Sequence, residues 1–423
     1  MKHFNLTLLT LTGIIISPAH SSFLHQSTVS LTTKNVYIDR NYIGKNVNQP
    51  ASKEWAQGFS LNANSGYTDS LVGVGIDLYA GIGLKLWGDA EHSRGTGMLP
   101  LESETGKPVG TFAEIGATAK LKYENTELKY GTLFPNTPVV IASFSRALPQ
   151  SYRGLQLVSK DIKNLKLELG YLDQVNHRDS TNYENIKLIP VNGRFKPIES
   201  DYLYYWGANY SLSSNTEFSM FYANFHDVYQ QYFTGLNQTY SIGEDLNLST
   251  DFRYFRTLGV GEKKAGEINN HHGNFILSLS KNNHKLSTGY IHNSGDTAMP
   301  YLSGGETATY MDSWATDFLN KKEKAYTIRY DYNFKDYIPG LRFMTRYTYG
   351  QDINLDHFVE LNNKKLYEKE LGFDLIYQIQ TGMFKGLNVR ARYANYDNNF
   401  GHVPTFKSAN ETRINIDYTW KFK

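Results

Sequence analysis

Short segments in which apolar and polar residues strictly alternate recur along this chain, and they limit its fold more than any other feature. In Ala325–Phe334, Tyr, Ile and Phe occupy every second position, and Thr, Arg, Asp and Asn lie between them. Successive side chains of a β-strand point to opposite faces, so such a segment predicts a strand with one apolar and one polar face. Four further segments alternate in the same way: Leu341–Gly350, Leu371–Gln378, Gly386–Tyr396 and Arg413–Phe422.

The breaks between these segments predict the two ends of a barrel. Lys335–Gly340 and Thr381–Gly386 are short, whereas Gln351–Lys369 and Asn395–Glu411 are long and polar. Short periplasmic turns that alternate with longer external loops are typical of outer-membrane barrels, and strands of about ten residues suit a tilted membrane crossing.

The spacing of the hairpins predicts the size of the barrel. Two successive hairpins begin at Ala325 and Leu371, so a mature chain of roughly 400 residues has room for about 16–18 strands, enough to enclose an aqueous lumen. We therefore predict an all-β fold, a transmembrane antiparallel β-barrel.

The composition separates a membrane barrel from other classes. Aromatic residues make up 14% of the chain and include 32 tyrosines, and aromatic girdles mark both interfaces of such barrels. The mean hydropathy is −0.48, and no apolar run after residue 22 approaches the roughly 20 residues that a transmembrane helix needs. A secreted β-sandwich or β-helix is the soluble alternative, but it would not need outward-facing tyrosines in strand after strand.

The first residues predict export. A basic start at Met1–His3 precedes an apolar run, Leu6–Ile16, and the small residues of Ser17–Ser22, which together are typical of a secretory signal peptide. We expect residues 1–22 to be this signal, with cleavage near residues 19–22, and residues 23–423 to form one barrel domain. A short buried helix is the alternative for the apolar run.

Charge and cysteine content exclude several functions. Lys and Arg total 43 and Asp and Glu total 41, whereas a binder of nucleic acid usually carries a clear basic excess. The chain has no cysteine, which excludes disulfides, thiolate zinc sites and a cysteine nucleophile. His271–His272, expected in a polar loop, has no third ligand at a suitable spacing, so we expect no metal site.

Arginines occur on the polar faces of the predicted strands with a regularity that indicates a lumen. Six of the 14 arginines lie after residue 320, and all six take the polar side: Arg329, Arg342, Arg346, Arg390, Arg392 and Arg413. Membrane stability requires part of this agreement, because an arginine facing lipid at the midplane costs about 2–4 kcal/mol. It does not require arginine where Asn, Thr or Ser would serve.

Guanidinium groups in a row can pass a carboxylate from one bidentate contact to the next. We therefore predict a basic track along the lumen. An ordinary polar lumen is the alternative, with charge balance from Asp331, Asp374 and Asp417.

Short motifs over nearly the whole mature chain resemble, in their order, the OprD-type substrate-specific outer-membrane porins. The motifs are Asn35–Arg40, Glu54–Phe59, Gly73–Asp77, Gly95–Pro100, Leu128–Gly131, Ser145–Gln150 with Gly154, Gln230–Gln231, Asp251–Phe255, Gly295–Asp296 with Pro300–Tyr301, Tyr330–Phe334 and Pro339–Leu341. The resemblance implies an 18-stranded barrel, monomeric or loosely trimeric and without a cofactor, with a narrow pore for small solutes that bear a carboxylate.

The resemblance also implies a constriction, formed by an inward-folded loop 3 together with loop 7. Ser145 and Arg146 match the loop 3 motif, and Asp296 matches the loop 7 acid. A cation that faces an anion across a constriction orients dipolar solutes. The basic ladder of the family maps onto Arg390, Arg392 and Arg413, with Arg178, Arg253 and Arg40 as further positions.

We therefore predict a porin of the bacterial outer membrane, surrounded by lipid and lipopolysaccharide, and not an enzyme. Its solutes would be small carboxylates, namely aromatic acids, dicarboxylates or amino acids, and we expect no nucleic-acid partner. Three alternatives stay open: a general porin with weak selectivity, a barrel protease or lipase, and a receptor or adhesin that uses long external loops.

Overall fold

The computed structural model describes residues 20–43, 49–189, 193–310, 313–401 and 407–422. The helices that lie wholly within these residues are α1 (His20–His25) and one 3-10 turn, η2 (Val359–Leu361). Among these residues, no helix is long and apolar enough to cross a membrane. The expected signal peptide lies almost entirely outside the described part, which begins at residue 20.

Eighteen long strands form one antiparallel sheet in the described part of the chain. They are β1 (Thr28–Ile43), β2 (Ala51–Asn64), β3 (Gly73–Trp87), β4 (Thr111–Tyr123), β5 (Thr126–Leu133), β8 (Ser151–Ser159), β9 (Leu165–Asn176), β13 (Leu203–Ser213), β14 (Thr216–Phe225), β15 (Tyr229–Ile242), β16 (Leu246–Gly259), β17 (Asn269–Lys281), β18 (His284–Gly295), β19 (Lys324–Asn333), β20 (Leu341–Ile353), β21 (Leu366–Gln378), β22 (Asn388–Asn398) and β23 (Ser408–Lys421). The short strands are β6 (Asn136–Thr137), β7 (Val140–Ile141), β10 (Tyr183–Glu184), β11 (Ile186–Lys187) and β12 (Glu199–Ser200).

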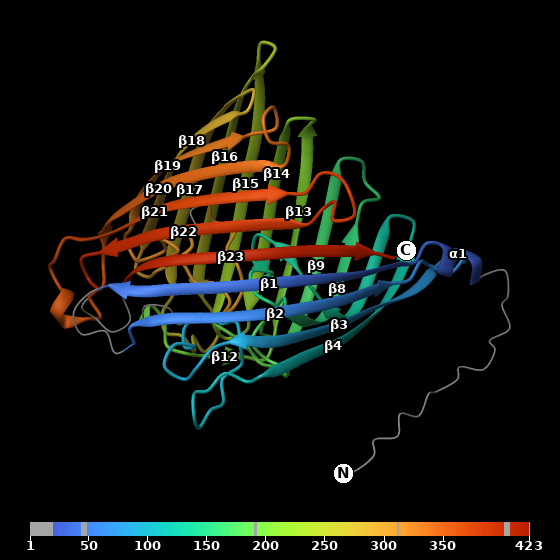
Figure 1. Cartoon of the computed structure of the whole chain (residues 1–423), viewed down its shortest axis with the longest axis horizontal. Helices are drawn as coiled ribbons and strands as arrows, with labels where there is room; N and C mark the ends of the chain where they lie inside the picture. The colour runs from blue at the N-terminus through green and yellow to red at the C-terminus, as the bar shows by residue number, and fades with distance from the viewer. Residues whose placement is uncertain (1–19, 44–48, 190–192, 311–312, 402–406, 423) are drawn as a thin grey trace.

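The first and last strands close the sheet into a barrel. β1 pairs with β23 in antiparallel register from Ser30 opposite Lys421 to Ile43 opposite Ser408, and the two strands lie side by side in Figure 1. A closed sheet has no edge strand with unpaired backbone groups, which is required in lipid. The predicted transmembrane antiparallel barrel of about 18 strands is confirmed.

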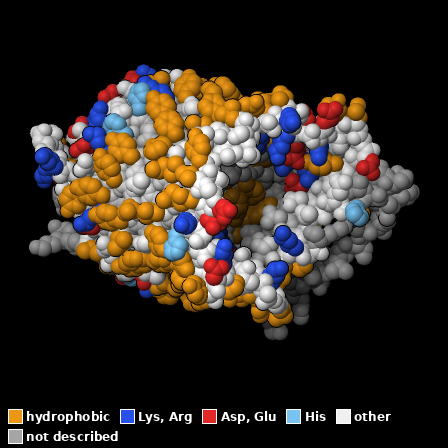
Figure 2. Space-filling model, turned by 90° about the horizontal axis from the view of Figure 1, so that it is seen from above, with side chains coloured by type: hydrophobic (Ala, Val, Ile, Leu, Met, Phe, Trp, Pro, Cys, Tyr) orange, Lys and Arg blue, Asp and Glu red, His pale blue; other side chains and the backbone are white. Residues whose placement is uncertain are grey.

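The two faces of the wall differ as the alternation predicts. On β21, Leu371 and Leu375 are exposed on the outside, whereas Glu370 and Asp374, the residues directly before them, are buried in the interior. Figure 2 shows hydrophobic side chains over much of the visible outer surface and a hollow that opens into the molecule. An apolar outer band with a polar interior matches a lipid-embedded barrel.

The predicted turns at 335–340 and 381–386 are present, but the predicted loops are too long. β20 continues to Ile353 and β21 already begins at Leu366, so the loop expected from Gln351 to Lys369 covers only 354–365. Likewise, β22 ends at Asn398 and β23 starts at Ser408, and residues 402–406 lie outside the described part. Backbone pairing continues into these polar residues because ladder hydrogen bonds do not depend on an apolar side chain.

Three long connections fold into the barrel: loop 3 (134–150), loop 4 (described at 177–189 and 193–202) and loop 7 (described at 296–310 and 313–323). Their apolar side chains share one buried cluster with the inner wall of β8–β16; it includes Val140 of loop 3, Leu188 of loop 4 and Leu302 of loop 7. This internal core fixes the loops in the lumen.

Loop 3 also lies tightly against β2. A Cβ atom at Gly58 would lie 2.0 Å from the carbonyl oxygen of Ala147 in loop 3. Only glycine therefore permits this approach of the loop to the wall. Next to it, Leu148 belongs to the same buried apolar cluster as Val36 and Ile38 of β1.

Candidate functional site

Loops 3 and 7 are joined to each other across the interior. The amide of Glu306 donates to the carbonyl oxygen of Ile141 over 3.1 Å, and the Ser143 hydroxyl donates to Glu306 Oε1 over 3.0 Å. The Gln150 side chain adds a bond of 2.9 Å to the carbonyl oxygen of Ser303. Since both loops are also packed on the wall, these bonds join two segments that lie inside the barrel.

Two arginines share one hydroxyl at this place. Arg146 Nη1 and Arg178 Nη1 each donate to Ser145 Oγ over 3.1 Å. Their Nε atoms donate to backbone carbonyls, Arg146 to Thr96 over 2.8 Å and Arg178 to Gly97 over 3.1 Å. In the part of the chain that the structure describes, neither guanidinium forms an ion pair with a carboxylate.

The electrostatics of this pair favour an incoming anion. Burial lowers the pKa of Arg146, and the nearby positive charges of Arg178 and Arg413 lower it further. A guanidinium stays charged at neutral pH in proteins. A bound carboxylate would therefore relieve the repulsion between these cations.

Asp296, the expected loop 7 acid, lies elsewhere. It is exposed just after β18, where its carboxylate accepts a bond of 2.7 Å from the Asn269 side chain. Among the described residues of loop 7, the acid that contacts loop 3 is Glu306, through Ser143. The motif located the start of loop 7, but only the path of the loop decides which of its acids enters the lumen.

Arg40 and Arg413 form a second cationic group on the wall. Arg40 of β1 and Arg413 of β23 both donate to the buried carboxylate of Glu411. Both also donate to the carbonyl oxygen of Trp314 in loop 7, over 3.3 and 2.6 Å. Two cations thus share one carboxylate, which leaves a net positive charge.

Arg392 of β22 lies next to this group, because it is the register partner of Arg413. Its Nη2 donates to Asn415 Oδ1 over 2.9 Å, and its Nε has no hydrogen-bond partner among the described residues. The neighbouring Lys34 of β1 donates to the carbonyl oxygen of Phe144 in loop 3.

Three further arginines lie nearer the end with the short turns. Arg390 bonds to Asp374 with 2.9 Å between Nε and Oδ1, Arg329 bonds to Asp331 with 2.6 Å between Nη2 and Oδ1, and Arg342 follows the turn at 335–340. The three line a cavity of about 380 Å³. We call the set on β19–β23 and β1 the basic ladder: Arg342, Arg329, Arg390, Arg392, Arg413 and Arg40.

Arg346 and Arg253 hold loop 7. Arg346 is buried, donates to Ser313 Oγ over 2.9 Å and lies 5.8 Å from the ring centre of Trp314. Arg253, on β16 and therefore away from the ladder strands, pairs with Asp251 at 2.6 Å and donates to the carbonyl oxygen of Ala308. Their contacts make both residues anchors of a loop.

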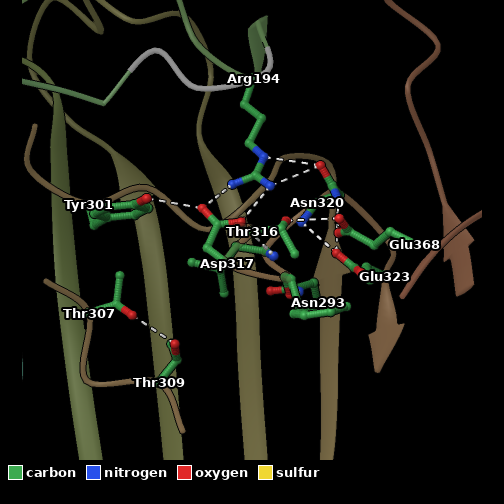
Figure 3. A network of polar contacts seen from close by, with 12 residues as sticks. Arg194, Asn293, Tyr301, Thr307, Thr309, Thr316, Asp317, Asn320, Glu323 and Glu368 are labelled. Atoms are coloured by element: carbon green, nitrogen blue, oxygen red, sulfur yellow. Dashed lines mark hydrogen bonds and ion pairs between the residues drawn. The ribbon is translucent and has the colours of Figure 1, made fainter. Parts of the chain in front are cut away.

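The sequence did not indicate one buried ion pair that links loops 4 and 7. Arg194 of loop 4 forms two bonds of 2.7 Å to the carboxylate of Asp317 in loop 7, which also accepts a bond of 3.0 Å from the Tyr301 hydroxyl (Figure 3). Burial opposes ionisation of Asp317, but Arg194 outweighs it and lowers the pKa of this carboxyl. Loops carry no periodicity, so no sequence signal pointed to this pair.

The histidine pair lies in a strand and not in the expected loop. His271 and His272 belong to β17, where His272 is buried and bonds to Asn293 Oδ1 over 2.8 Å. Among the residues that the structure describes, no group of three His, Cys, Asp or Glu side chains could hold a metal ion.

Comparison with known proteins gives consistent matches over the whole barrel. The model of the outer membrane porin family OprD matches residues 21–422. Porin D of Pseudomonas aeruginosa is 31% identical over 418 residues, which cover 94% of this chain and 91% of that protein. The crystal structure of OccAB2 of Acinetobacter baumannii has 50% identity and a TM-score of 0.90, covering 95% of this chain and 100% of that one. OpdK of Pseudomonas aeruginosa, solved with vanillate, has 28% identity and a TM-score of 0.86, covering 95% and 100%.

Proposed function

The chain belongs to the OprD family of outer membrane porins, and we propose that it is selective for small solutes that carry a carboxylate. It is a β-barrel of the bacterial outer membrane and a passive channel, so solutes diffuse through it down their concentration gradient.

One observation carries the proposal: Arg146 and Arg178 converge on Ser145 where loops 3 and 7 meet, and neither pairs with a carboxylate among the described residues. Backbone carbonyls and a hydroxyl hold both guanidinium groups in position without neutralising them. An arginine fork can bind a carboxylate through two parallel hydrogen bonds, and such charge-assisted bonds are about twice as strong as neutral ones.

The basic ladder extends this site toward the short turns. From the constriction, the carboxylate of a solute would pass to Arg392 and then to Arg390 and Arg342. Arg390 is held by Asp374, so a solute there exchanges with a carboxylate already present. Conduction needs sites that bind well enough for entry and weakly enough for exit, and a neutralised ladder position near the exit meets the second condition.

Relatives support the same class of solute. Vanillate, the molecule with which OpdK was solved, is an aromatic carboxylate. This chain retains cations at its own constriction and along its own wall, as a path for such an anion requires.

A general porin with weak selectivity is the second candidate. The observation that favours it is that acids of the wall already neutralise part of the positive charge in the lumen. The paired arginines are Arg40, Arg413, Arg390 and Arg329. Saturation separates the two candidates, because a selective path saturates with its solute whereas a general pore does not.

The test is conductance across planar bilayers with a panel of solutes: an aromatic acid, a dicarboxylate, an amino acid and the neutral amide of the aromatic acid. We expect current or flux to saturate for at least one carboxylate and not for the neutral amide. Equal, non-saturating flux of the acid and its amide would refute carboxylate selectivity.

A further inference from the structure

Residues 313–323 of loop 7 lie along the inner wall at the end of the basic ladder that is formed by Arg40 and Arg413, and we call these residues the strap. Its first half is bound by Glu370 of β21, which accepts bonds from the Ser313 hydroxyl and from the amides of Trp314 and Ala315, the last over 2.9 Å. The carbonyl oxygen of Trp314 occupies donors of Arg40 and Arg413. The strap thus takes contacts that a solute carboxylate would use.

The second half of the strap is bound by a pair of buried carboxyl groups. The Asn320 side-chain amide donates to Glu323 of the strap over 3.0 Å and to Glu368 of β21 over 2.7 Å (Figure 3). Glu368 also accepts bonds from the hydroxyls of Thr316, over 2.8 Å, and of Tyr396 on β22. Glu323, Asn320 and Glu368 are all fully buried.

The charges around this pair do not balance two ionised carboxylates. Arg194 faces the pair from loop 4, but Asp317 of the strap already holds it in a double ion pair. Three other titratable groups lie close by. Two are tyrosine hydroxyls, of Tyr396 on β22 and Tyr301 on loop 7, and the third is the imidazole of His272 on β17, which bonds to Asn293. Lys324 is half-buried and already pairs with Asp352.

The position of Glu323 also disfavours its anion. Its Oε1 has no hydrogen-bond partner among the described residues. This oxygen lies so close to Gly350 of β20 that a Cβ atom added there would be only 2.1 Å from it. An ionised carboxylate oxygen that is buried without a donor is costly. Burial, followed by the charge of Glu368, raises the pKa of Glu323 well above its usual range.

We propose that the strap is a proton-controlled gate on the carboxylate path: a proton held between Glu323 and Glu368 keeps the strap on the wall, and its loss frees Arg40 and Arg413 for the solute. This rests on the proposed function, because it assigns a regulation to the same path. No second ligand is needed, since the proton is exchanged with water.

The direction of the pH effect follows from linkage. In a released strap, a solvated Glu323 has an ordinary pKa of about 4.3, whereas in the bound strap its pKa is higher. Proton binding therefore favours the bound strap. As the pH rises above the ordinary value, the ratio of bound to released strap falls by up to about tenfold per pH unit until the raised pKa is reached. The open fraction should increase with pH.

The experiment records single-channel currents of the full chain in potassium chloride from mildly acidic to mildly basic pH. We expect the open probability of the wild type to rise with pH. Glu323→Gln keeps a neutral side chain at all pH values, so its profile should be flat and its channel mostly closed. The control is Glu262→Gln, at an exposed loop position, which should keep the wild-type profile. A wild type without pH dependence, or a Glu323→Gln profile that follows the wild type, would overturn the proposal.

A labelling experiment covers the case that Glu323→Gln assembles poorly or alters conductance by another route. The chain has no cysteine, so Ala315→Cys places one thiol on the strap. At each pH, the maleimide labelling rate of Ala315→Cys is divided by that of Ala315→Cys/Glu323→Gln. This ratio cancels the intrinsic pH dependence of the thiol. We expect the ratio to rise with pH, and a constant ratio would overturn the gate.

Failure of the gate and failure of the proposed function can be told apart. Potassium chloride currents and thiol labelling report on the strap without any carboxylate solute. Carboxylate saturation reports on the selective path at one fixed pH. If the strap responds to pH but no carboxylate saturates the channel, the strap is a proton-controlled gate. In that case the carboxylate path that it was proposed to control is refuted.

Discussion

Arg146 and Arg178 reach the hydroxyl oxygen of Ser145 from two different loops, each over 3.1 Å. Loop 3 carries Arg146 and loop 4 carries Arg178, so the two cations come together only in the folded barrel. Because a hydroxyl and backbone carbonyls hold them, their charge remains available to an anion. The first prediction concerns this pair.

Arg146→Ala should weaken carboxylate permeation. Loss of one hydrogen bond to a charged group costs about 1.5–3 kcal/mol, and 1.4 kcal/mol corresponds to about tenfold in affinity. We expect the half-saturating concentration of an aromatic acid, measured by flux into proteoliposomes, to rise at least about tenfold. Arg94→Ala, at an exposed position of the loop between β3 and β4, is the matched control. An unchanged half-saturating concentration in Arg146→Ala would show that this arginine does not bind the solute.

Arg392→Ala should lower carboxylate flux and leave the neutral amide unaffected. Among the described residues, Arg392 Nε has no hydrogen-bond partner, and its Nη2 bonds to the neutral side chain of Asn415, so its removal breaks few structural contacts. The matched control is Arg153→Ala, an exposed arginine paired with Asp173. If acid and amide fluxes fall together, Arg392 shapes the pore and does not recognise the anion.

Asp374→Asn should strengthen carboxylate binding at Arg390. The mutation removes the anion that now occupies this guanidinium, and about 1 kcal/mol of added affinity corresponds to roughly fivefold. Single-channel recordings should therefore show longer blockades by an aromatic acid. Shorter or unchanged blockades would argue against Arg390 as a residue that binds the solute.

Gly58→Ala should displace loop 3 without unfolding the barrel. The added Cβ would lie 2.0 Å from the carbonyl oxygen of Ala147, a distance that backbone atoms cannot accept. We expect a larger single-channel conductance and weaker discrimination between the acid and its amide. The control is Gly110→Ala, where nothing lies within 4 Å of the new Cβ. Wild-type conductance in Gly58→Ala would show that loop 3 does not set the constriction.

The part of the site on the strands could be predicted from the sequence. Alternation places Arg390, Arg392 and Arg413 opposite the apolar positions of their strands, and the structure puts them on the inner wall. The loops carry no such periodicity. Glu306, Arg194, Asp317 and the strap were therefore missed, and Asp296 was placed at a contact that Glu306 makes.

The amino-acid sequence by itself determined the barrel class and, for the alternating segments after residue 320, the side of the wall on which the side chains lie, because a period of two is a local property of the backbone. Only the tertiary structure decided which arginines keep a free charge. Neutralising partners come from distant parts of the chain: the acid that holds Arg40 is Glu411, 371 residues away. Electrostatic balance depends on distance in space, and loop paths and barrel closure set that distance.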